Sequence, residues 1–183
     1  MLKEKVPLNI VVPVVVVTWI LSVVSSFAIV LTMPNLLMPH HVHNSGWHVS
    51  WRTVDPQNWN TLDQWSTGEI GTSNFSPMFS YAREWYAFQN YQDWIGFVAT
   101  MQVEVREDGP VTFTIGSDDG ARLFVDDELQ IDIWRRTGYE KMSKTIQLNK
   151  GFHTLRLEWF DGGGWAIVSF QCDSPDILTW TRT

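Results

Sequence analysis

The stretch GPVTFTIGSDDGARLFVD, residues 109–126, decides the fold. In its first half the apolar side chains of Val111, Phe113 and Ile115 are separated by single threonines. Successive side chains of a β-strand point to opposite faces, so this alternation predicts a half-buried strand. Residues 117–120 then supply aspartate and glycine, which turns favour. The stretch therefore predicts a strand that ends in a tight turn.

The same alternation occurs in two further runs, Met101/Val103/Val105 and Leu155/Leu157/Trp159. Turn-forming sequences separate the runs, at residues 107–110, 117–120, 149–151 and 161–164. No stretch after Trp47 keeps the 3.6-residue apolar period of a helix. Strands about ten residues apart with such turns predict an all-β antiparallel sandwich over residues 47–183. Residues 55–90 show no regular pattern and are left unassigned.

An uncharged segment precedes this β-rich part. Residues 6–51 contain no Asp, Glu, Lys or Arg, and residues 8–33 are rich in Val, Ile and Leu. A helix of that length spans a hydrocarbon core of about 30 Å, so the segment predicts one uncleaved transmembrane helix. A cleaved signal peptide is the alternative, but its apolar region is only about 7–15 residues long and ends in small residues.

The lysines nearest the predicted helix lie on its N-terminal side. Lys3 and Lys5 precede it, and the next basic residue is Arg52. Basic flanks stay in the cytoplasm, so residues 1–7 are expected to be a cytoplasmic tail. The expected order after the helix is a juxtamembrane linker, residues 34–46, and a periplasmic or extracellular domain, residues 47–183. The predicted location is therefore the plasma (inner) membrane, crossed once.

Small side chains form one face of the predicted helix, at Ser22, Ser25 and Ser26. Small residues at this spacing let a neighbouring helix approach closely, which predicts a helix-packing surface. Serine hydroxyls that bond the carbonyl four residues earlier in their own helix are an equal alternative.

Charge and the remaining reactive residues restrict the function further. The formal net charge of −7 argues against nucleic-acid binding, which needs a basic face. The lone Cys172 shares strand parity with Val168 and Phe170, which predicts a buried thiol. A histidine group could be a metal site or a polar connector, and it contains His40, His41, His43 and His48. No cysteine or acidic residue nearby completes a coordination set, which favours the connector.

Four segments in order resemble motifs of one family: WIGF at 94–97, residues 109–126, IDIW at 131–134 and QLNKGFHTLRLEW at 147–159. The family is the PA-fourteen domain, named for the anthrax protective antigen and also found in fungal adhesins and glycosidases. The resemblance extends over residues 93–170. It implies a sandwich of jelly-roll type that usually serves as a binding or spacer module rather than as an active site.

The resemblance also gives Asp118 and Asp119 a role. In sugar-binding members, two such aspartates hold a calcium ion that the sugar hydroxyls complete. Neighbours in a strand face opposite sides, so both carboxylates reach one ion only if the peptide between them is distorted, for instance cis. Such members place an asparagine in a later loop, whereas residues 161–165 here read DGGGW. The alternative is a turn whose aspartates cap backbone amides.

No residue pattern suggests a catalyst. The adjacent aspartate pairs do not match two carboxylates flanking a glycosidic bond, and no serine has a nucleophile-elbow context. The favoured hypothesis is a non-catalytic accessory subunit of a larger membrane assembly, of the photosynthetic or respiratory kind. The alternatives are a calcium-dependent surface lectin or adhesin that binds carbohydrate, and an ancillary domain of a separate enzyme. The expected ligand- or partner-binding positions are Trp134, Asp161 and Trp165.

Overall fold

The computed structural model describes residues 46–60, 68–173 and 177–180. Within these ranges no helix is long and apolar enough to cross a membrane. The predicted transmembrane helix with Ser22, Ser25 and Ser26 lies outside the described residues, and so do His40, His41 and His43. His48 is described, and its side chain is exposed on the first strand.

The described residues form eleven β-strands. They are β1 (Trp47–Thr53), β2 (Glu69–Phe75), β3 (Phe79–Arg83), β4 (Ile95–Val105), β5 (Gly109–Asp118), β6 (Ala121–Val125), β7 (Glu128–Asp132), β8 (Glu140–Leu148), β9 (Gly151–Asp161), β10 (Ala166–Cys172) and β11 (Leu178–Trp180). All strand pairs are antiparallel, as expected when consecutive strands are joined by short turns.

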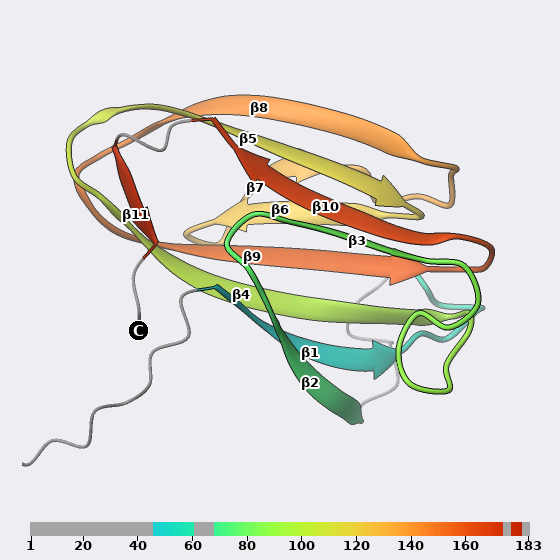
Figure 1. Ribbon diagram of the computed structural model, residues 1–183. Coiled ribbons are helices and arrows are strands. Elements are labelled where there is room, and N and C mark those ends of the chain that lie inside the picture. The colour runs from blue at the N-terminus through green and yellow to red at the C-terminus, as the bar shows by residue number, and fades with distance from the viewer. Residues whose placement is uncertain (1–45, 61–67, 174–176, 181–183) are drawn as a thin grey trace, which may run out of the picture. The chain divides into compact units, whose positions relative to one another are not determined.

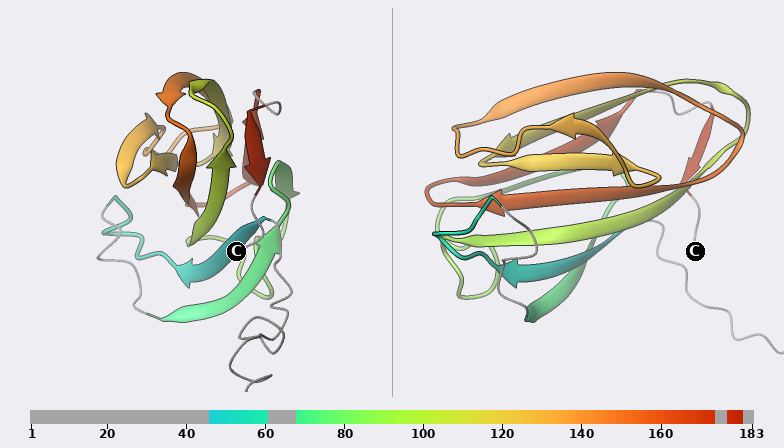
Figure 2. Two further views of the ribbon diagram at one scale, coloured as in Figure 1. Left: turned by 90° about the vertical axis from the view of Figure 1, so that its left-hand side faces the viewer. Right: turned by 180° about the vertical axis from the view of Figure 1, so that it is seen from behind.

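Two sheets form the layers of the sandwich. One has the order β2-β1-β4-β9-β6-β7, with β11 added beside β4, and the other has the order β3-β10-β5-β8. Figure 1 shows β8, β5 and β10 in one layer and β9, β4 and β1 in the other, and Figure 2 gives two further views of the same layers. The predicted all-β antiparallel sandwich is confirmed.

The core lies between the sheets and follows the predicted alternation. All nine apolar positions of the three alternating runs are buried: Met101, Val103, Val105, Val111, Phe113, Ile115, Leu155, Leu157 and Trp159. Aromatic rings from loops and neighbouring strands complete it. The Trp51 ring stacks on Phe88 with centroids 4.5 Å apart and meets the edge of Phe97 at 5.2 Å. Aromatic contacts of this geometry add to the stabilisation from apolar burial.

Two further expectations concern single segments. Cys172 is 6% exposed, so the predicted buried thiol is confirmed. Of the unassigned residues 55–90, the part that the structure describes contains two strands, β2 and β3, followed by the loop of residues 84–94 that leads to β4.

The strand register separates the sandwich into two ends. Pairing of Ile95 with Asp161 and of Ser117 with Glu140 places one set of loops together, on the right in Figure 1. We call this the loop end, and its described segments are residues 54–60, 84–94, 119–120, 133–139 and 162–165. The opposite end carries the turn of the β6–β7 hairpin and the short β4–β5 and β8–β9 connections, which cross from one sheet to the other, and we call it the hairpin end.

Candidate functional site at the loop end

Asp118 is the last residue of β5, and Asp119 begins the tight turn that leads to β6. The peptide bond between them is cis. Asp118 is partly exposed, whereas Asp119 is 6% exposed. Burial, together with the negative charge of Asp119, raises the pKa of Asp118 above its ordinary value.

Both carboxylate oxygens of Asp119 accept backbone hydrogen bonds from other loops. The N–H of Thr137 donates to Oδ1 over 2.8 Å, and the N–H of Gly162 donates to Oδ2 over 2.7 Å. A buried carboxylate that accepts two amides is stabilised in its charged form and fixes both donors. Asp119 therefore joins the β5–β6 turn, the β7–β8 loop and the β9–β10 loop. This agrees with the capping interpretation, although the capped amides belong to distant loops.

Asp161, the last residue of β9, is fully buried beneath these loops. Its Oδ1 accepts the N–H of Gly163 over 3.2 Å, whereas its Oδ2 has no hydrogen-bond partner within the described part of the chain. Burial is the main cause that raises the pKa of Asp161 to about 7. The negative charges of Asp119, Asp93 and Asp118 raise this pKa further, against the bond from Gly163 that lowers it.

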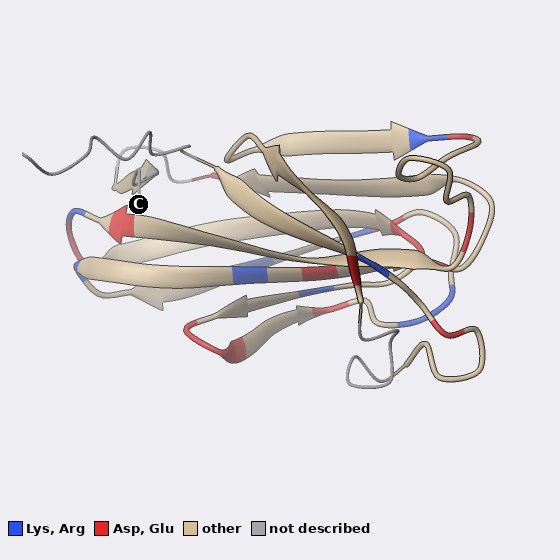
Figure 3. Cartoon of the chain, turned by 90° about the horizontal axis from the view of Figure 1, so that it is seen from below, with Lys and Arg blue, Asp and Glu red and all other residues tan. Residues whose placement is uncertain are grey.

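The loop end therefore contains an acidic cluster of Asp93, Asp118, Asp119 and Asp161. The structure brings together three carboxylates that the sequence singled out and adds Asp93, which the sequence analysis missed. Asp93 lies two residues before Ile95, the pairing partner of Asp161, so the signal was available only through the register of β4 and β9. Figure 3 shows acidic and basic positions close together in the loops at this end, on the right.

An arginine and a tryptophan lie against the acidic cluster. The Arg136 guanidinium is 5.1 Å from the centroid of the Trp94 ring, a cation–π distance. A Cβ atom added at Gly162 would lie 3.0 Å from Asp119 Oδ2, 3.2 Å from Arg136 Nε and 3.5 Å from the Trp94 ring. All three groups therefore lie close around the point where a side chain at Gly162 would begin. The positively charged Arg136 side chain therefore lies beside the acidic cluster, where a metal ion would also be attracted.

The two tryptophans expected to bind a ligand have different surroundings. The Trp134 ring packs edge-on against Phe160, with centroids 4.9 Å apart, and carries the Arg122 guanidinium at 4.0 Å. Its indole N–H donates to the carbonyl of Asn60 over 3.1 Å. Trp165, four residues after Asp161, is instead 53% exposed. Trp134 is therefore held within the fold, and Trp165 is available to solvent.

Exposed aromatic side chains concentrate at the loop end. All exposed aromatic residues of the described ranges except Phe152 lie in its loops: Trp85, Tyr86, Tyr91, Tyr139 and Trp165. We call these five the aromatic surface. Scattered single apolar residues are ordinary on a protein surface, but exposed aromatics collected from three loops at one end are typical of an interaction site.

The acidic cluster also bears on the predicted calcium site. Among the described residues no three His, Cys, Asp or Glu side chains are placed to hold a metal ion. The raised pKa values of Asp118 and Asp161 point the other way, because clustered carboxylates attract a cation. Both Asp119 oxygens are directed at backbone amides, and the calcium role of Asp118 and Asp119 stays a prediction from the sequence.

Comparison with known families and structures gives a consistent picture. The family model described as the PA14 domain, the PA-fourteen domain of the motifs above, matches residues 63–180. A search of curated proteins gave no match. Among solved structures, an anti-sigma factor domain-containing protein is 23% identical with a TM-score of 0.57. The match covers 72% of this chain and 44% of that protein, so the chain spans less than half of its length.

Two isolated domains are also similar. The PA14 sugar-binding domain from an RTX adhesin is 13% identical with a TM-score of 0.56, over 70% of this chain and 89% of that domain. The PA14 domain of the antifreeze protein MpAFP is 14% identical with a TM-score of 0.55, over 74% of this chain and 81% of that domain. At these identities the similarity establishes the fold.

Proposed function

This chain belongs to the PA14 domain family, and from that premise we propose that it is a non-catalytic accessory subunit of a larger membrane assembly. The sequence predicts a single transmembrane helix before the sandwich and an extracytoplasmic location for the sandwich itself. In this proposal the helix holds the chain in the membrane, and the loop end of the sandwich binds a protein partner of the assembly.

The observation that carries the proposal is the aromatic surface. Trp85 is 66% exposed, Tyr86 57% and Trp165 53%, in a domain that buries Trp47, Trp51 and Trp159 completely or nearly so. Tryptophan and tyrosine are enriched among the residues that contribute most to protein interfaces. Three separate loops supply the aromatic surface, so it is broad rather than a single slot for a small ligand.

The contacts of Asp119 and Arg136 support the same proposal. Asp119 bonds to two loops, and Arg136 lies over Trp94, so the loops that carry the aromatic side chains are fixed before any partner binds. A pre-ordered surface loses less conformational entropy on association than a mobile one. The photosynthetic or respiratory identity of the assembly remains a prediction from the sequence.

Co-purification tests this function. A tagged full-length chain, purified from its native membranes in mild detergent, is expected to retain another membrane protein at a fixed stoichiometry. The Trp85→Ala/Tyr86→Ala variant should lose that protein, because it removes two exposed rings of the aromatic surface. Phe152→Ala is the matched control, since Phe152 is 68% exposed at the hairpin end. Equal recovery of the partner by both variants would contradict a role for the loop end.

A second candidate function is calcium-dependent carbohydrate binding. The specific observation in its favour is the buried Oδ2 atom of Asp161, which has no partner among the described residues and lies among other carboxylates. Asp118 and Asp119, the pair singled out by the sequence, would bind the ion near Asp161. The ion would supply coordination sites for sugar hydroxyls, and the exposed Trp165 would stack on the sugar ring. Calorimetric titration of the protein with calcium chloride separates the two candidates, because the accessory-subunit proposal needs no ion.

A further inference from the structure

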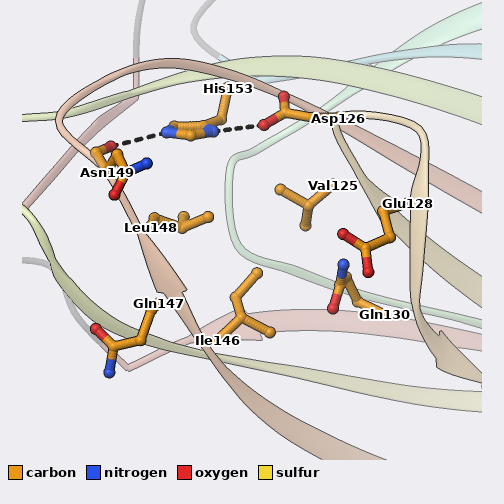
Figure 4. A pocket seen from close by; sticks show the side chains of 9 residues that line it. All are labelled: Val125, Asp126, Glu128, Gln130, Ile146, Gln147, Leu148, Asn149 and His153. Atoms are coloured by element: carbon orange, nitrogen blue, oxygen red, sulfur yellow. Dashed lines mark hydrogen bonds and ion pairs between the residues drawn. The ribbon is translucent and has the colours of Figure 1, made fainter.

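A polar pocket lies at the hairpin end, away from the aromatic surface. It has a volume of about 280 Å³ and lies between β7, the edge strand of one sheet, and β8, the edge strand of the other. The β6–β7 and β8–β9 turns close its upper side in the view of Figure 4. The open side of the sandwich therefore forms a recess that neither sheet covers.

The inner wall of the pocket is aliphatic. Val125 and Leu148 are only 3% and 6% exposed, and Ile146 is partly buried. No Phe, Tyr or Trp ring is among the nine lining residues. Such a wall favours a short alkyl chain over a sugar ring, for which protein sites commonly provide a flat aromatic surface.

His153 and Asp126 form an ion pair at the pocket rim, and their polar atoms are bonded to groups of the protein itself. The Nδ1–H of His153 donates to Asp126 Oδ2 over 2.6 Å, and the Nε2–H donates to the carbonyl of Asn149 over 2.8 Å. Both partners are acceptors, so the site suits the protonated imidazole, which donates through both ring nitrogens. Asp126 Oδ1 also accepts the N–H of Thr154 over 2.9 Å. His153 and Asp126 therefore neutralise each other and bind one another rather than a ligand.

Glu128 remains as the uncompensated charge of the pocket. The two bonds of His153 are the only hydrogen bonds drawn among the nine lining residues, so the carboxylate of Glu128 is not paired with another of them. The Gln130 side chain comes from the same strand and adds an amide oxygen on that side. No lysine or arginine is among the nine lining residues, so the pocket offers an anion no free cationic partner.

We propose that this pocket binds a primary ammonium group carried on a short aliphatic chain. The chain lies along Val125, Ile146 and Leu148, and the ammonium donates to Glu128 and to the amide oxygen of Gln130. A charge-assisted hydrogen bond of this kind is stronger than a neutral one, and the acidic charge of the protein favours the approach of a cation. A free alkylamine and the lysine side chain of a polypeptide share this chemistry.

Methyl NMR on the full-length chain in detergent micelles tests the proposal. Titration with n-butylammonium chloride is expected to shift the Val125, Ile146 and Leu148 methyl signals in a saturable way, whereas n-butanol and sodium butyrate should leave them in place. Glu128→Gln keeps the side-chain size and removes the charge, so it should weaken binding about threefold to tenfold. Glu84→Gln makes the same charge change at the loop end and should bind like the unmodified chain.

A second arm distinguishes the two sources of the ammonium group. An acetylated and amidated Gly-Lys-Gly peptide that shifts the same methyl signals supports a lysine side chain, and butylammonium binding without peptide binding supports a free amine. Glucose that shifts these signals while both amines fail would overturn the proposal. Unchanged butylammonium affinity in Glu128→Gln would also overturn it.

Discussion

The backbone N–H of Gly162 donates to the Oδ2 atom of Asp119 over 2.7 Å, and this bond connects two loops that are 43 residues apart in the sequence. With the bond from Thr137, it makes one carboxylate the common acceptor for two loops of the candidate site. The loop end is therefore held by specific polar contacts as well as by the packing beneath it.

Replacing Asp119 by alanine should destabilise the fold by about 2–4 kcal/mol, because two backbone amides lose their acceptor in a buried setting. Asp108→Ala is the matched control. The Asp108 carboxylate also caps a backbone amide, that of Lys150 at 2.6 Å, but in an exposed turn where water replaces it. Urea unfolding followed by tryptophan fluorescence measures both losses. If the two variants lose the same stability, Asp119 is an ordinary surface cap.

Asp161 should make the protein less stable as the pH rises from about 4 to 7. Its pKa is about 7 in the folded chain and 3.8 in the reference state, so the folded protein retains a proton that the unfolded chain releases across this window. Asp161→Asn should match the unmodified chain near pH 4 and exceed its stability at pH 8 by roughly 1–3 kcal/mol.

The control for this pH series is Asp127→Asn, because the Asp127 side chain is 93% exposed. Its stability curve should keep the slope of the unmodified protein between pH 4 and 7. Thermal unfolding at unit intervals of pH provides the comparison. An Asp161→Asn curve that falls as steeply as that of the unmodified chain would show that Asp161 ionises normally.

Removing calcium should leave the melting temperature unchanged. Both Asp119 oxygens accept backbone amides, so an ion has no complete set of free ligands to stabilise the native state. Differential scanning calorimetry of one preparation with chelator and then with millimolar calcium chloride is sufficient. A rise of several degrees on adding calcium, lost in Asp161→Asn, would favour the carbohydrate-binding candidate instead.

His153 should add a stabilisation that is present in acid and lost in alkali. Burial alone would lower the pKa of His153, but the bonds to the Asn149 carbonyl and the Asp126 carboxylate raise it above its ordinary value of 6.5. A raised pKa means that the folded state binds the proton more tightly, so the contribution is complete below pH 6.5. It disappears as the pH rises through the folded pKa.

The variant His153→Asn tests this dependence, because it removes the titrating ring and keeps a polar side chain. Relative to the unmodified chain it should lose most stability at pH 5–6 and least at pH 9. Equilibrium unfolding in urea across this range measures the difference. A loss that does not depend on pH would assign His153 a packing role only.

The interior strands were predictable because each has a buried face and neighbours on both sides. β4, β5 and β9 occupy such positions in their sheets, so their apolar residues recur at every second position. β2 and β3 lie at sheet edges, and most of their side chains are exposed or half-buried. Because neither face of these strands is fully buried, their apolar and polar residues need not alternate, and the sequence analysis left both strands unassigned.

The candidate site was predictable only where its residues are neighbours in the chain. Asp118 and Asp119 stand together in a recognisable turn, whereas Asp93 joins them through strand pairing across the sheet. Tryptophan content alone also gave little information about the surface. Trp47, Trp51 and Trp159 fill the core, and the exposed Trp85 and Trp165 are distinguished from them only by their position in loops.

The length of β9 sets the separation between the two binding regions. Eight residue steps lead from His153 at the pocket to Asp161 beneath the loop end, which corresponds to about 26 Å along an extended strand. That separation exceeds the Debye length of about 8 Å at physiological ionic strength, so charges at one end are largely screened from the other. Occupancy of the pocket and of the loop end should therefore be thermodynamically independent. An amine bound in the pocket would leave the loop end free to bind a protein partner. One small domain would then bring together two ligands without coupling their affinities.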